Sequence, residues 1–300
     1  MTQSGDGPAV VAVDLHKRYG STVALDGLSF EFPTGRLTGF LGPNGAGKTT
    51  TLRAILGLTR LDSGTITVRG QPIVTRLPEI VKQVGAIVDE PGLLRPLSGR
   101  HNLVVAAHTL GFGHERIEDL AAFVELSADL DRPVSGYSKG MRQRLALAAA
   151  LIGDPNILFL DEPLDGLDPA GQHTFKGRLR QLVDEDGRTV VMSSHNLTDV
   201  QALADNVVLI AAGSLRYQGP LPDLLGGARA FRVSVSDPNA ARAALSDAGM
   251  EVEVVADGSL VVAAEDGSAV SRALAAAQLY PSALVPADQT LESVFLELTS

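Results

Sequence analysis

Short runs of apolar residues alternate with stretches of helical periodicity along most of this chain. The apolar runs are typical of strands buried on both faces of a parallel sheet and lie at 37–41, 156–160 and 189–192. The helical stretches carry apolar residues three and four positions apart and lie at 49–58, 101–110, 117–126 and 138–152. This alternation predicts an α/β protein built on a parallel sheet, with a helical subdomain between residues 91 and 153.

The two ends of the chain follow other patterns. Residues 9–40 alternate as strands do, with a turn expected at Leu25-Asp26-Gly27, which predicts an antiparallel β subdomain. Beyond residue 225 the expected order is strand, helix, two strands, helix, strand, which is the ferredoxin-like order. We therefore predict a large domain over 1–225 and a small accessory α+β domain over 226–300. A structural or dimerising role is favoured for the small domain over the alternative of a regulatory ligand sensor.

A glycine-rich segment joins the run at 37–41 to the next helix and reads Gly42-Pro43-Asn44-Gly45-Ala46-Gly47-Lys48-Thr49. It matches the phosphate-binding loop of P-loop nucleotidases, and a chance match between a strand and a helix is rare. Glycines let successive N–H groups turn inward at a helix N-terminus, where they bind phosphate. We expect Lys48 to reach the β and γ phosphates, the Thr49 hydroxyl to hold Mg²⁺, and Thr50 to complete the loop's contacts with ATP.

Two acidic residues, Asp161 and Glu162, follow the apolar run at 156–160. Carboxylates at the carboxyl end of a parallel strand open into the ligand crevice. We expect Asp161 to bind Mg²⁺ through water and Glu162 to polarise the attacking water. The alternative is an acidic strand end that leads into a turn at Pro163.

The helix predicted from Ser138 to Ile152 begins with a second candidate anion site. Ser138 is a plausible N-cap, and Gly140 leaves the first turn open, but no Lys-Thr pair accompanies them to hold a metal. The second half of this helix reads as a plain amphipathic core helix.

Together these segments resemble the ATPase subunit of ATP-binding cassette (ABC) transporters, over roughly residues 9 to 225. The family's signature sequence corresponds to Tyr137-Ser138-Lys139-Gly140-Met141, and the resemblance implies that Ser138 and Gly140 grip ATP held by a second copy. The resemblance also implies that Asp168, in Leu164-Asp165-Gly166-Leu167-Asp168, crosses the dimer interface. It makes His195, in Ser193-Ser194-His195, the γ-phosphate contact, and makes Tyr19 the aromatic residue that stacks on adenine.

Some of these assignments have simpler alternatives, and two positions depart from the family pattern. His195 could be a capped or solvated residue, and Tyr19 could pack at a strand end. Lys139 places a cation in the second anion site where the family has glycine. Asp89 stands where the family has glutamine, and we expect it near Mg²⁺, although a turn cap before Pro91 is the alternative. An acidic residue at this position makes the chain similar to the branch of the family that exports peptide antibiotics and related compounds.

Composition agrees with an ATPase that acts through a partner. The chain has 300 residues, no cysteine and a net charge of −10, which argues against disulfides and against broad binding to nucleic acid. We see no signal peptide, and the apolar runs fall short of the ~18 residues that span a bilayer.

We therefore expect the ATPase subunit of an ABC exporter, with Lys48, Glu162 and His195 as its catalytic residues and ATP and Mg²⁺ as its cofactors. Its expected partners are a second copy of itself and an integral membrane permease. It would lie in the cytoplasm, peripheral to the inner face of the cell membrane. Two other classes remain open: a soluble ABC ATPase acting on DNA or ribosomes, and a nucleotide-binding regulator that no longer hydrolyses ATP.

Overall fold

A computed structural model describes residues 7–88, 92–225, 230–255, 257–264, 266–287 and 290–299. The chain groups into two compact units, and each is described separately below. Unit 1 comprises Met1–Leu221 and Leu298–Ser300, and unit 2 comprises Pro222–Glu297. The predicted boundary after residue 225 lies close to this grouping, but the last residues of the chain group with unit 1.

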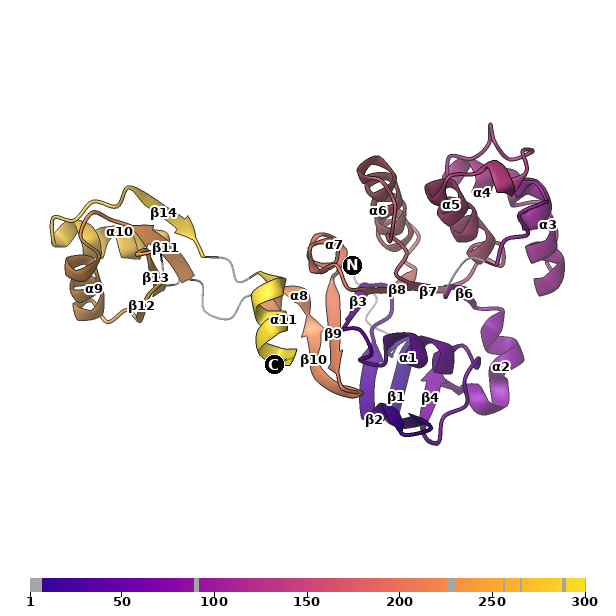
Figure 1. Cartoon of the computed structure of the whole chain (residues 1–300), viewed down its shortest axis with the longest axis horizontal. Coiled ribbons are helices and arrows are strands. Elements are labelled where there is room, and N and C mark those ends of the chain that lie inside the picture. The colour runs from indigo at the N-terminus through magenta and orange to yellow at the C-terminus, as the bar shows by residue number, and fades with distance from the viewer. Residues whose placement is uncertain are drawn as a thin grey trace. The chain divides into compact units, whose positions relative to one another are not determined.

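The first part of the chain, up to residue 220, alternates strands and helices (Figure 1). Its elements are β1 Val10–Tyr19, β2 Thr22–Phe32, β3 Leu37–Leu41, α1 Lys48–Ile55, β4 Ser63–Val68, β5 Gln71–Pro72, α2 Ile73–Val81, β6 Val84–Ile87, α3 Gly99–Leu110, α4 Ile117–Phe123, the 3₁₀ helix η1 Val134–Gly136, α5 Lys139–Ala150, β7 Ile157–Asp161, α6 Pro169–Asp184, β8 Thr189–Ser194, α7 Leu197–Leu203, β9 Asn206–Ala211 and β10 Ser214–Pro220.

The central sheet of unit 1 has the order β10-β9-β3-β8-β7-β6. Its strands are parallel except β10, which pairs antiparallel with β9 at the edge. Every residue of β3, β7 and β8 is buried, as the unbroken apolar runs predicted. Because β3, β8 and β7 are neighbours and run in the same direction, their carboxyl ends meet at one edge of the sheet.

A second, antiparallel sheet of order β2-β1-β4-β5 packs near the central sheet through aromatic side chains. The Phe32 ring lies 4.7 Å from the ring of Phe30, 5.7 Å from that of Phe40 and 6.4 Å from that of Phe159, measured between centroids. Phe40 belongs to β3 and Phe159 to β7, so this cluster ties both strands to the antiparallel sheet. Burial of such rings is a large favourable contribution to folding.

The turn predicted at Leu25-Asp26-Gly27 is wrong. Strand β2 continues through these residues. The hairpin turn between β1 and β2 is instead formed by residues 20 and 21, since Tyr19 pairs with Thr22. Gly27 instead has φ 69° at a shift of register, where Asp26 pairs with His16 and Leu28 with Leu15. A glycine inside a strand pattern marks a β-bulge as well as a turn, and here it forms the bulge.

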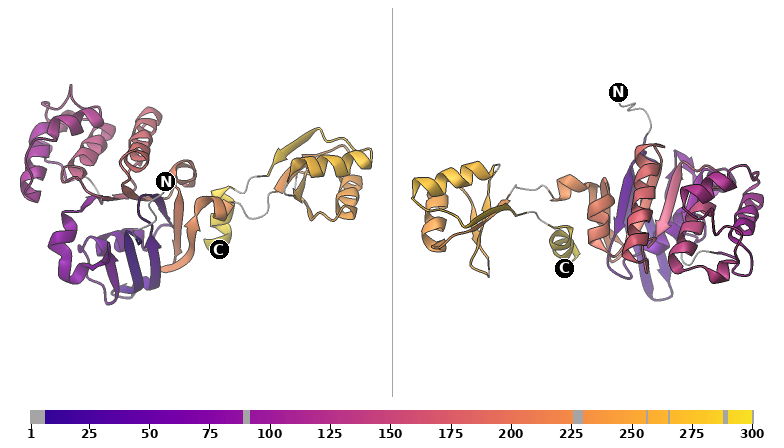
Figure 2. Two further views of the ribbon diagram at one scale, coloured as in Figure 1. Left: turned by 180° about the vertical axis from the view of Figure 1, so that it is seen from behind. Right: turned by 90° about the horizontal axis from the view of Figure 1, so that it is seen from above.

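The predicted helical subdomain is present as α3, α4 and α5, which pack against one another (Figure 2). Ser98 caps α3 by accepting a hydrogen bond from the N–H of His101. Asn102 clamps the preceding segment onto this helix, because its Oδ1 accepts from Leu94 N at 2.7 Å and its Nδ2 donates to Leu94 O at 3.1 Å. The segment that follows β6 is therefore anchored to the helical subdomain.

The last part of the chain contains α8 Leu221–Leu225, β11 Ala230–Ser234, α9 Pro238–Asp247, β12 Val252–Val254, β13 Leu260–Ala263, α10 Gly267–Ala276, β14 Ala283–Pro286 and α11 Leu291–Thr299. Strands β11 to β14 form an antiparallel sheet of order β12-β13-β11-β14, which confirms the predicted ferredoxin-like order. Val233, Leu260 and Val262 alternate along the strands and form a separate core with Leu245 and Leu274 of α9 and α10. Unit 2 therefore has a hydrophobic core of its own.

Candidate nucleotide site

The phosphate-binding loop lies between β3 and α1, as predicted. Gly42 and Gly47 are required by close approach: a Cβ on Gly42 would lie 2.4 Å from Ile210 O, and one on Gly47 would lie 2.6 Å from Ala24 O. Gly47 also has φ 107° and is the N-cap of α1. Because glycine has no side chain to cap the helix, the first N–H groups of α1 are left for an anionic ligand. Pro43, Asn44 and Gly45 are exposed above this turn, and Ala46 is buried beneath it.

Lys48 begins α1 and is buried, with 7% of its surface exposed. Its ammonium donates to Gly42 O at 2.6 Å, so the cation lies against the loop itself. Burial lowers the pKa of Lys48, and the charges of Glu162 and Asp161 oppose this shift. A positive charge thus faces two carboxylates at the mouth of the loop, where phosphate groups would add further negative charge.

The carboxylate of Asp161 lies between two hydroxyl groups at the carboxyl end of β7. Thr49 Oγ1 donates to Asp161 Oδ2 at 2.8 Å, and Ser193 Oγ, from the neighbouring strand β8, donates to Asp161 Oδ1. The two groups expected to hold Mg²⁺, the Thr49 hydroxyl and the Asp161 carboxylate, are therefore in direct contact. Both offer oxygen atoms, which are the ligands that this hard cation prefers. The residues present fit a magnesium site.

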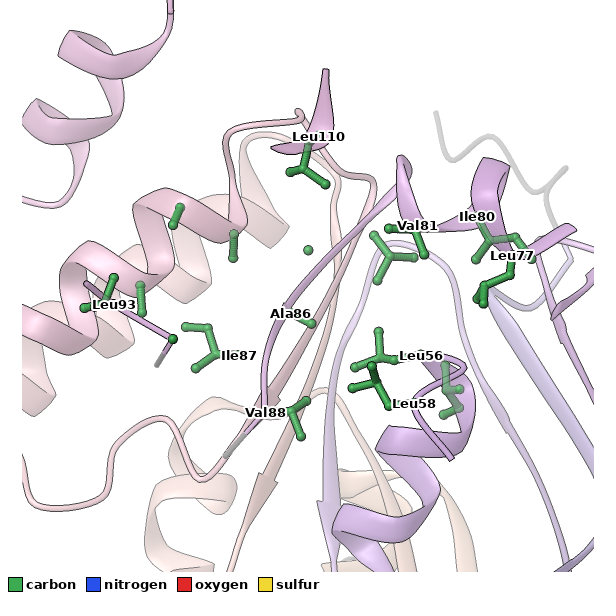
Figure 3. Close-up of a pocket in the computed structure, with 17 residues that line it drawn as sticks. Leu56, Leu58, Leu77, Ile80, Val81, Ala86, Ile87, Val88, Leu93 and Leu110 are labelled. Carbon is green, nitrogen blue, oxygen red and sulfur yellow. The ribbon is translucent and has the colours of Figure 1, made fainter. Parts of the chain in front are cut away.

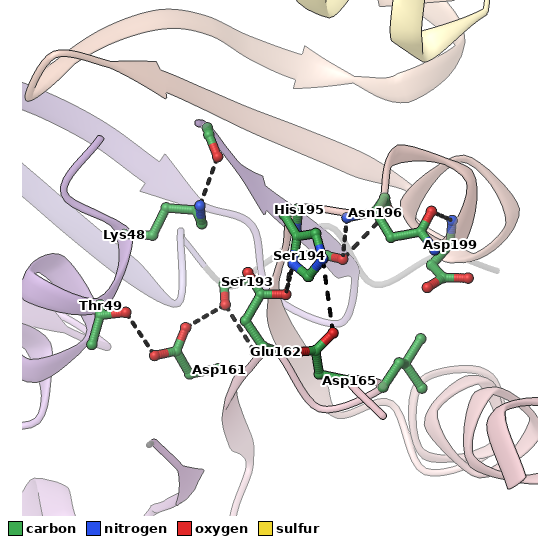
Figure 4. A network of polar contacts seen from close by, with 12 residues as sticks. Lys48, Thr49, Asp161, Glu162, Asp165, Ser193, Ser194, His195, Asn196 and Asp199 are labelled. Carbon is green, nitrogen blue, oxygen red and sulfur yellow. Dashed lines mark hydrogen bonds and ion pairs between the residues drawn. The ribbon is translucent and has the colours of Figure 1, made fainter. Parts of the chain in front are cut away.

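Glu162 and His195 contact each other directly (Figure 4). His195 Nδ1 lies 2.9 Å from Glu162 Oε2, and the backbone N–H of His195 donates to the same oxygen at 3.2 Å. Glu162 has φ 47°, in the left-handed region, and its N–H donates to Ser193 Oγ at 3.0 Å. The end of β8 therefore holds both the backbone and the carboxylate of the proposed base.

Ser193 and Asp165 are the residues of this site that the sequence reasoning missed. Ser193 contacts both Asp161 and Glu162, and Asp165 Oδ1 lies 3.8 Å from His195 Nε2. The available signal for Ser193 was its position: it is a polar residue at the carboxyl end of a buried apolar run, where side chains open into the ligand crevice of a parallel sheet.

The remaining predicted residues make other contacts in the structure. Ser138 caps α5 by accepting from Met141 N at 3.2 Å, and Asp168 caps α6 by accepting from Gly171 N at 3.2 Å. Gly140 is half-buried in the first turn of α5. Tyr19 is 48% exposed, and Lys17 Nζ lies 5.1 Å from its ring centroid. The nucleotide-binding roles of these residues stay predictions, and Asp89 lies outside the described residues.

Lys139 lies beside the loop that follows β7. A Cβ on Gly166 would lie 2.3 Å from Lys139 Nζ and 3.0 Å from its Cε. Gly166 has φ 65°, a conformation that glycine adopts without strain. The lysine that distinguishes this signature sequence therefore lies over the loop that carries Asp165 and Asp168.

An apolar pocket of about 410 Å³ lies between the nucleotide-binding core and the helical subdomain (Figure 3). Its lining comes from the end of α1 and the residues just after it, from α2, β6 and α5, from Leu110 at the end of α3, and from the segment at Gly92 and Leu93. Leu58 and Val81 line it and remain 68% and 39% exposed.

Among the described residues, no helix is both long enough and apolar enough to cross a membrane.

Comparison with known proteins agrees with this geometry. The chain matches the ABC transporter family over residues 25–165. It is 37% identical over 234 residues to the bacitracin transport ATP-binding protein BcrA of Bacillus licheniformis, covering 77% of this chain and 76% of that protein. It is 38% identical over 210 residues to the Nod factor export ATP-binding protein I of Burkholderia lata, covering 69% of each.

The fold also matches a solved structure, that of cbiO1 from Clostridium perfringens, which is part of the ABC transporter complex cbiONQ. The TM-score is 0.66 at 26% identity, covering 73% of this chain and 91% of that one. The chain therefore belongs to the ABC transporter family, as an ATP-binding subunit whose reaction is ATP hydrolysis.

Proposed function

We propose that this chain is the ATPase subunit of an ABC exporter, and that two copies enclose two Mg-ATP to drive a separate membrane permease. The observation that carries the ATPase mechanism is the convergence of Lys48, Thr49, Asp161, Glu162 and His195 at the carboxyl ends of β3, β7 and β8. Export is supported by the likeness to the bacitracin transport and Nod factor export proteins.

Each residue of this cluster is assigned one role. Lys48 and the N–H groups at the start of α1 bind the phosphates, and Thr49 and Asp161 would hold Mg²⁺, which neutralises phosphate charge when it is bound. Glu162 accepts a proton from the attacking water, and His195 holds the γ-phosphate. Tyr19 is proposed to stack on adenine. Asp89 is proposed near the metal, so Asp89→Gln should shift the Mg²⁺ concentration for half-maximal hydrolysis.

The test of the catalytic assignment is Glu162→Gln, which removes the carboxylate and keeps the shape of the side chain. We expect turnover to fall by roughly 10² to 10⁴-fold while ATP still binds, since the loop is intact. Glu185→Gln, an exposed glutamate at the end of α6, is the matched control and should leave turnover unchanged. Hydrolysis by Glu162→Gln at the wild-type rate would rule out Glu162 as the base.

The dimer is supported by the second anion site. Ser138 and Gly140 lie at the N-terminus of α5, and α5 and α1 lie in separate parts of unit 1 (Figure 1). Among the described residues, the cluster of acidic and histidine side chains that could hold a metal is Glu162, Asp165 and His195 and includes no residue of this site, which supports a nucleotide held by another copy. A mixture of Lys48→Ala and Ser138→Arg chains should keep at most one working site per heterodimer. Normal hydrolysis by Ser138→Arg as a monomer would contradict this arrangement.

The permease is proposed to dock on the surface near Asp89 to Asn102, where Gly92 and Leu93 line the apolar pocket beside β6. Leu58 and Val81 are exposed there, and a contiguous exposed apolar patch marks an interaction surface. The subunit would then lie on the inner face of the membrane. Leu58→Asp should weaken co-purification with detergent-solubilised membrane protein, whereas Leu215→Asp, an exposed leucine on the edge strand β10, should not. Crosslinks only to ribosomes or DNA would overturn the exporter proposal.

The accessory domain over 226–300 is proposed to be structural or dimerising. It is supported by the separate hydrophobic core of unit 2.

A further inference from the structure

The His195 ring lies between two carboxylates rather than one. Glu162 accepts from the backbone N–H of His195 and contacts Nδ1 of its ring. On the opposite side of the ring, Asp165 Oδ1 lies 3.8 Å from Nε2, and Figure 4 shows both carboxylates directed at the imidazole. Because Glu162 occupies Nδ1, Nε2 is the ring atom left for a ligand, and Asp165 lies on that side.

The position of Asp165 is set by its loop. Its N–H donates to Glu162 O at 3.1 Å, which closes a tight turn directly after β7. The next residue, Gly166, has φ 65°, and the Lys139 side chain lies over it. Within the described parts of the chain, His195 is the one basic side chain within 4 Å of the Asp165 carboxylate, which is 59% exposed.

We propose that Asp165 weakens the binding of ATP at this site relative to the binding of ADP. ATP can place its γ-phosphate at His195 only after the Asp165 carboxylate has moved away from the ring. The proposal rests on the proposed role of His195 as the γ-phosphate contact. A γ-phosphate and the Asp165 carboxylate are both anions, and both require the Nε2 side of the same ring. ADP lacks the competing group, so its binding does not require this displacement.

The expected size of the effect follows from Coulomb's law. Two like charges that compete for the same side of one ring repel each other, weakly in water and more strongly where solvent is partly excluded. Removing one of them should therefore tighten binding of a γ-phosphate by about three- to tenfold. A carboxylate that only stabilised the turn would have no reason to distinguish two nucleotides that share their base, ribose and first two phosphates.

The test is Asp165→Asn in the full chain, with dissociation constants measured for ADP and for a non-hydrolysable ATP analogue, adenylyl imidodiphosphate. The analogue should bind about three- to tenfold more tightly to the variant, and ADP should change less than about twofold. Asp119→Asn, an exposed aspartate in the first turn of α4, removes the same charge elsewhere and should alter neither constant. Unchanged binding of the analogue, or equal tightening of both nucleotides, would overturn the proposal.

The His195→Ala variant separates this inference from the function on which it rests. If His195→Ala hydrolyses ATP as the wild type does, the proposed role of His195 fails. If His195→Ala loses activity while Asp165→Asn binds both nucleotides as the wild type does, only the inference about Asp165 fails. In the double variant, the tightening caused by Asp165→Asn should be smaller than in the wild-type background, because the contested ring is gone.

Discussion

The hydroxyl of Ser193 donates a hydrogen bond to the carboxylate of Asp161, which joins the carboxyl ends of the neighbouring strands β8 and β7. The same oxygen accepts from the N–H of Glu162 at 3.0 Å. One buried serine therefore orients both the proposed metal ligand and the backbone of the proposed base. Loss of a residue that orients a metal ligand typically lowers metal affinity or activity by about 10- to 100-fold.

Ser193→Ala should lower the rate of ATP hydrolysis by about 10-fold, because the Asp161 carboxylate loses a donor that fixes its orientation. The Mg²⁺ concentration for half-maximal activity should rise in the same variant, whereas the far-ultraviolet circular dichroism should stay unchanged. A steady-state titration of Mg²⁺ at saturating ATP measures both effects. Wild-type kinetics in Ser193→Ala would show that Asp161 is held adequately without this hydroxyl.

Thr38→Val should raise stability. Thr38 Oγ1 is buried in β3 and has no hydrogen-bond partner among the described residues. Replacing such a hydroxyl with a methyl group removes an unsatisfied polar atom, which should stabilise the fold by about 1 kcal/mol. Thermal unfolding checks this, with Thr51→Val as the matched control. Thr51 is equally buried but donates to Gly47 O at 2.8 Å, so its loss should lower the melting temperature. Equal shifts in the two variants would contradict the argument.

Gly42→Ala should impair nucleotide binding through sterics alone. Its Cβ would lie 2.4 Å from the backbone oxygen of Ile210 and 2.9 Å from the Cβ of Ala46, and neither atom can rotate away. The loop must then shift by an amount that misplaces its N–H groups, so we expect at least about a 10-fold loss of ATP affinity. Gly177→Ala, at an exposed position in α6 where the added Cβ would meet no atom within 4 Å, provides the comparison and should leave affinity intact. Calorimetric titration of both variants decides the matter.

Asp154→Asn should lower stability slightly, and the loss should depend on pH. A hydrogen bond from Arg188 holds the pKa of Asp154 below its ordinary value, with Arg116 contributing charge. A carboxyl group with a depressed pKa stabilises the fold at any pH above the pKa of the unfolded chain, which for Asp is about 4. This contribution is lost as the pH falls through the pKa of the folded protein.

The side chain of Asp154 is 66% exposed, so the effect at pH 7 should be below about 1 kcal/mol. Asparagine also tolerates the φ of 53° found here, which isolates the charge. Melting temperatures of both proteins from pH 7 to pH 3 should converge at the acidic end. A constant difference would assign the loss to something other than ionisation.

Local patterns predicted the elements well, because the pattern and the burial coincide in this fold. The run at 37–41 matches β3, and the glycine-rich loop after it has the expected strand and helix on either side. Lys48, Thr49, Asp161, Glu162 and His195 were identified from motifs, and the structure brings them together. Their catalytic roles stay predictions.

What sequence reasoning missed depends on which segments become neighbours. The order of strands places β8 beside β7 although α6 separates them in the chain, so the contacts of Ser193 with Asp161 and Glu162 could not be read from spacing. The Lys139 side chain lies over Gly166 for the same reason. The turn predicted at Gly27 was wrong for a different reason. A glycine in a strand pattern is compatible with both a turn and a β-bulge until the residue that pairs with it is known.

The left-handed backbone conformation of Glu162 restricts which substitutions can report on chemistry. At φ 47°, a β-branched residue would carry a conformational penalty of its own, independent of any proton transfer. With valine, isoleucine or threonine at this position, a loss of activity would therefore have two causes, the distorted end of the strand and the missing carboxylate, and kinetics alone would not separate them. Asparagine or glycine would adopt this conformation with less strain, and the backbone could then shift relative to His195. A variant library at this position consequently measures two quantities at once, and glutamine is the substitution that best keeps them apart.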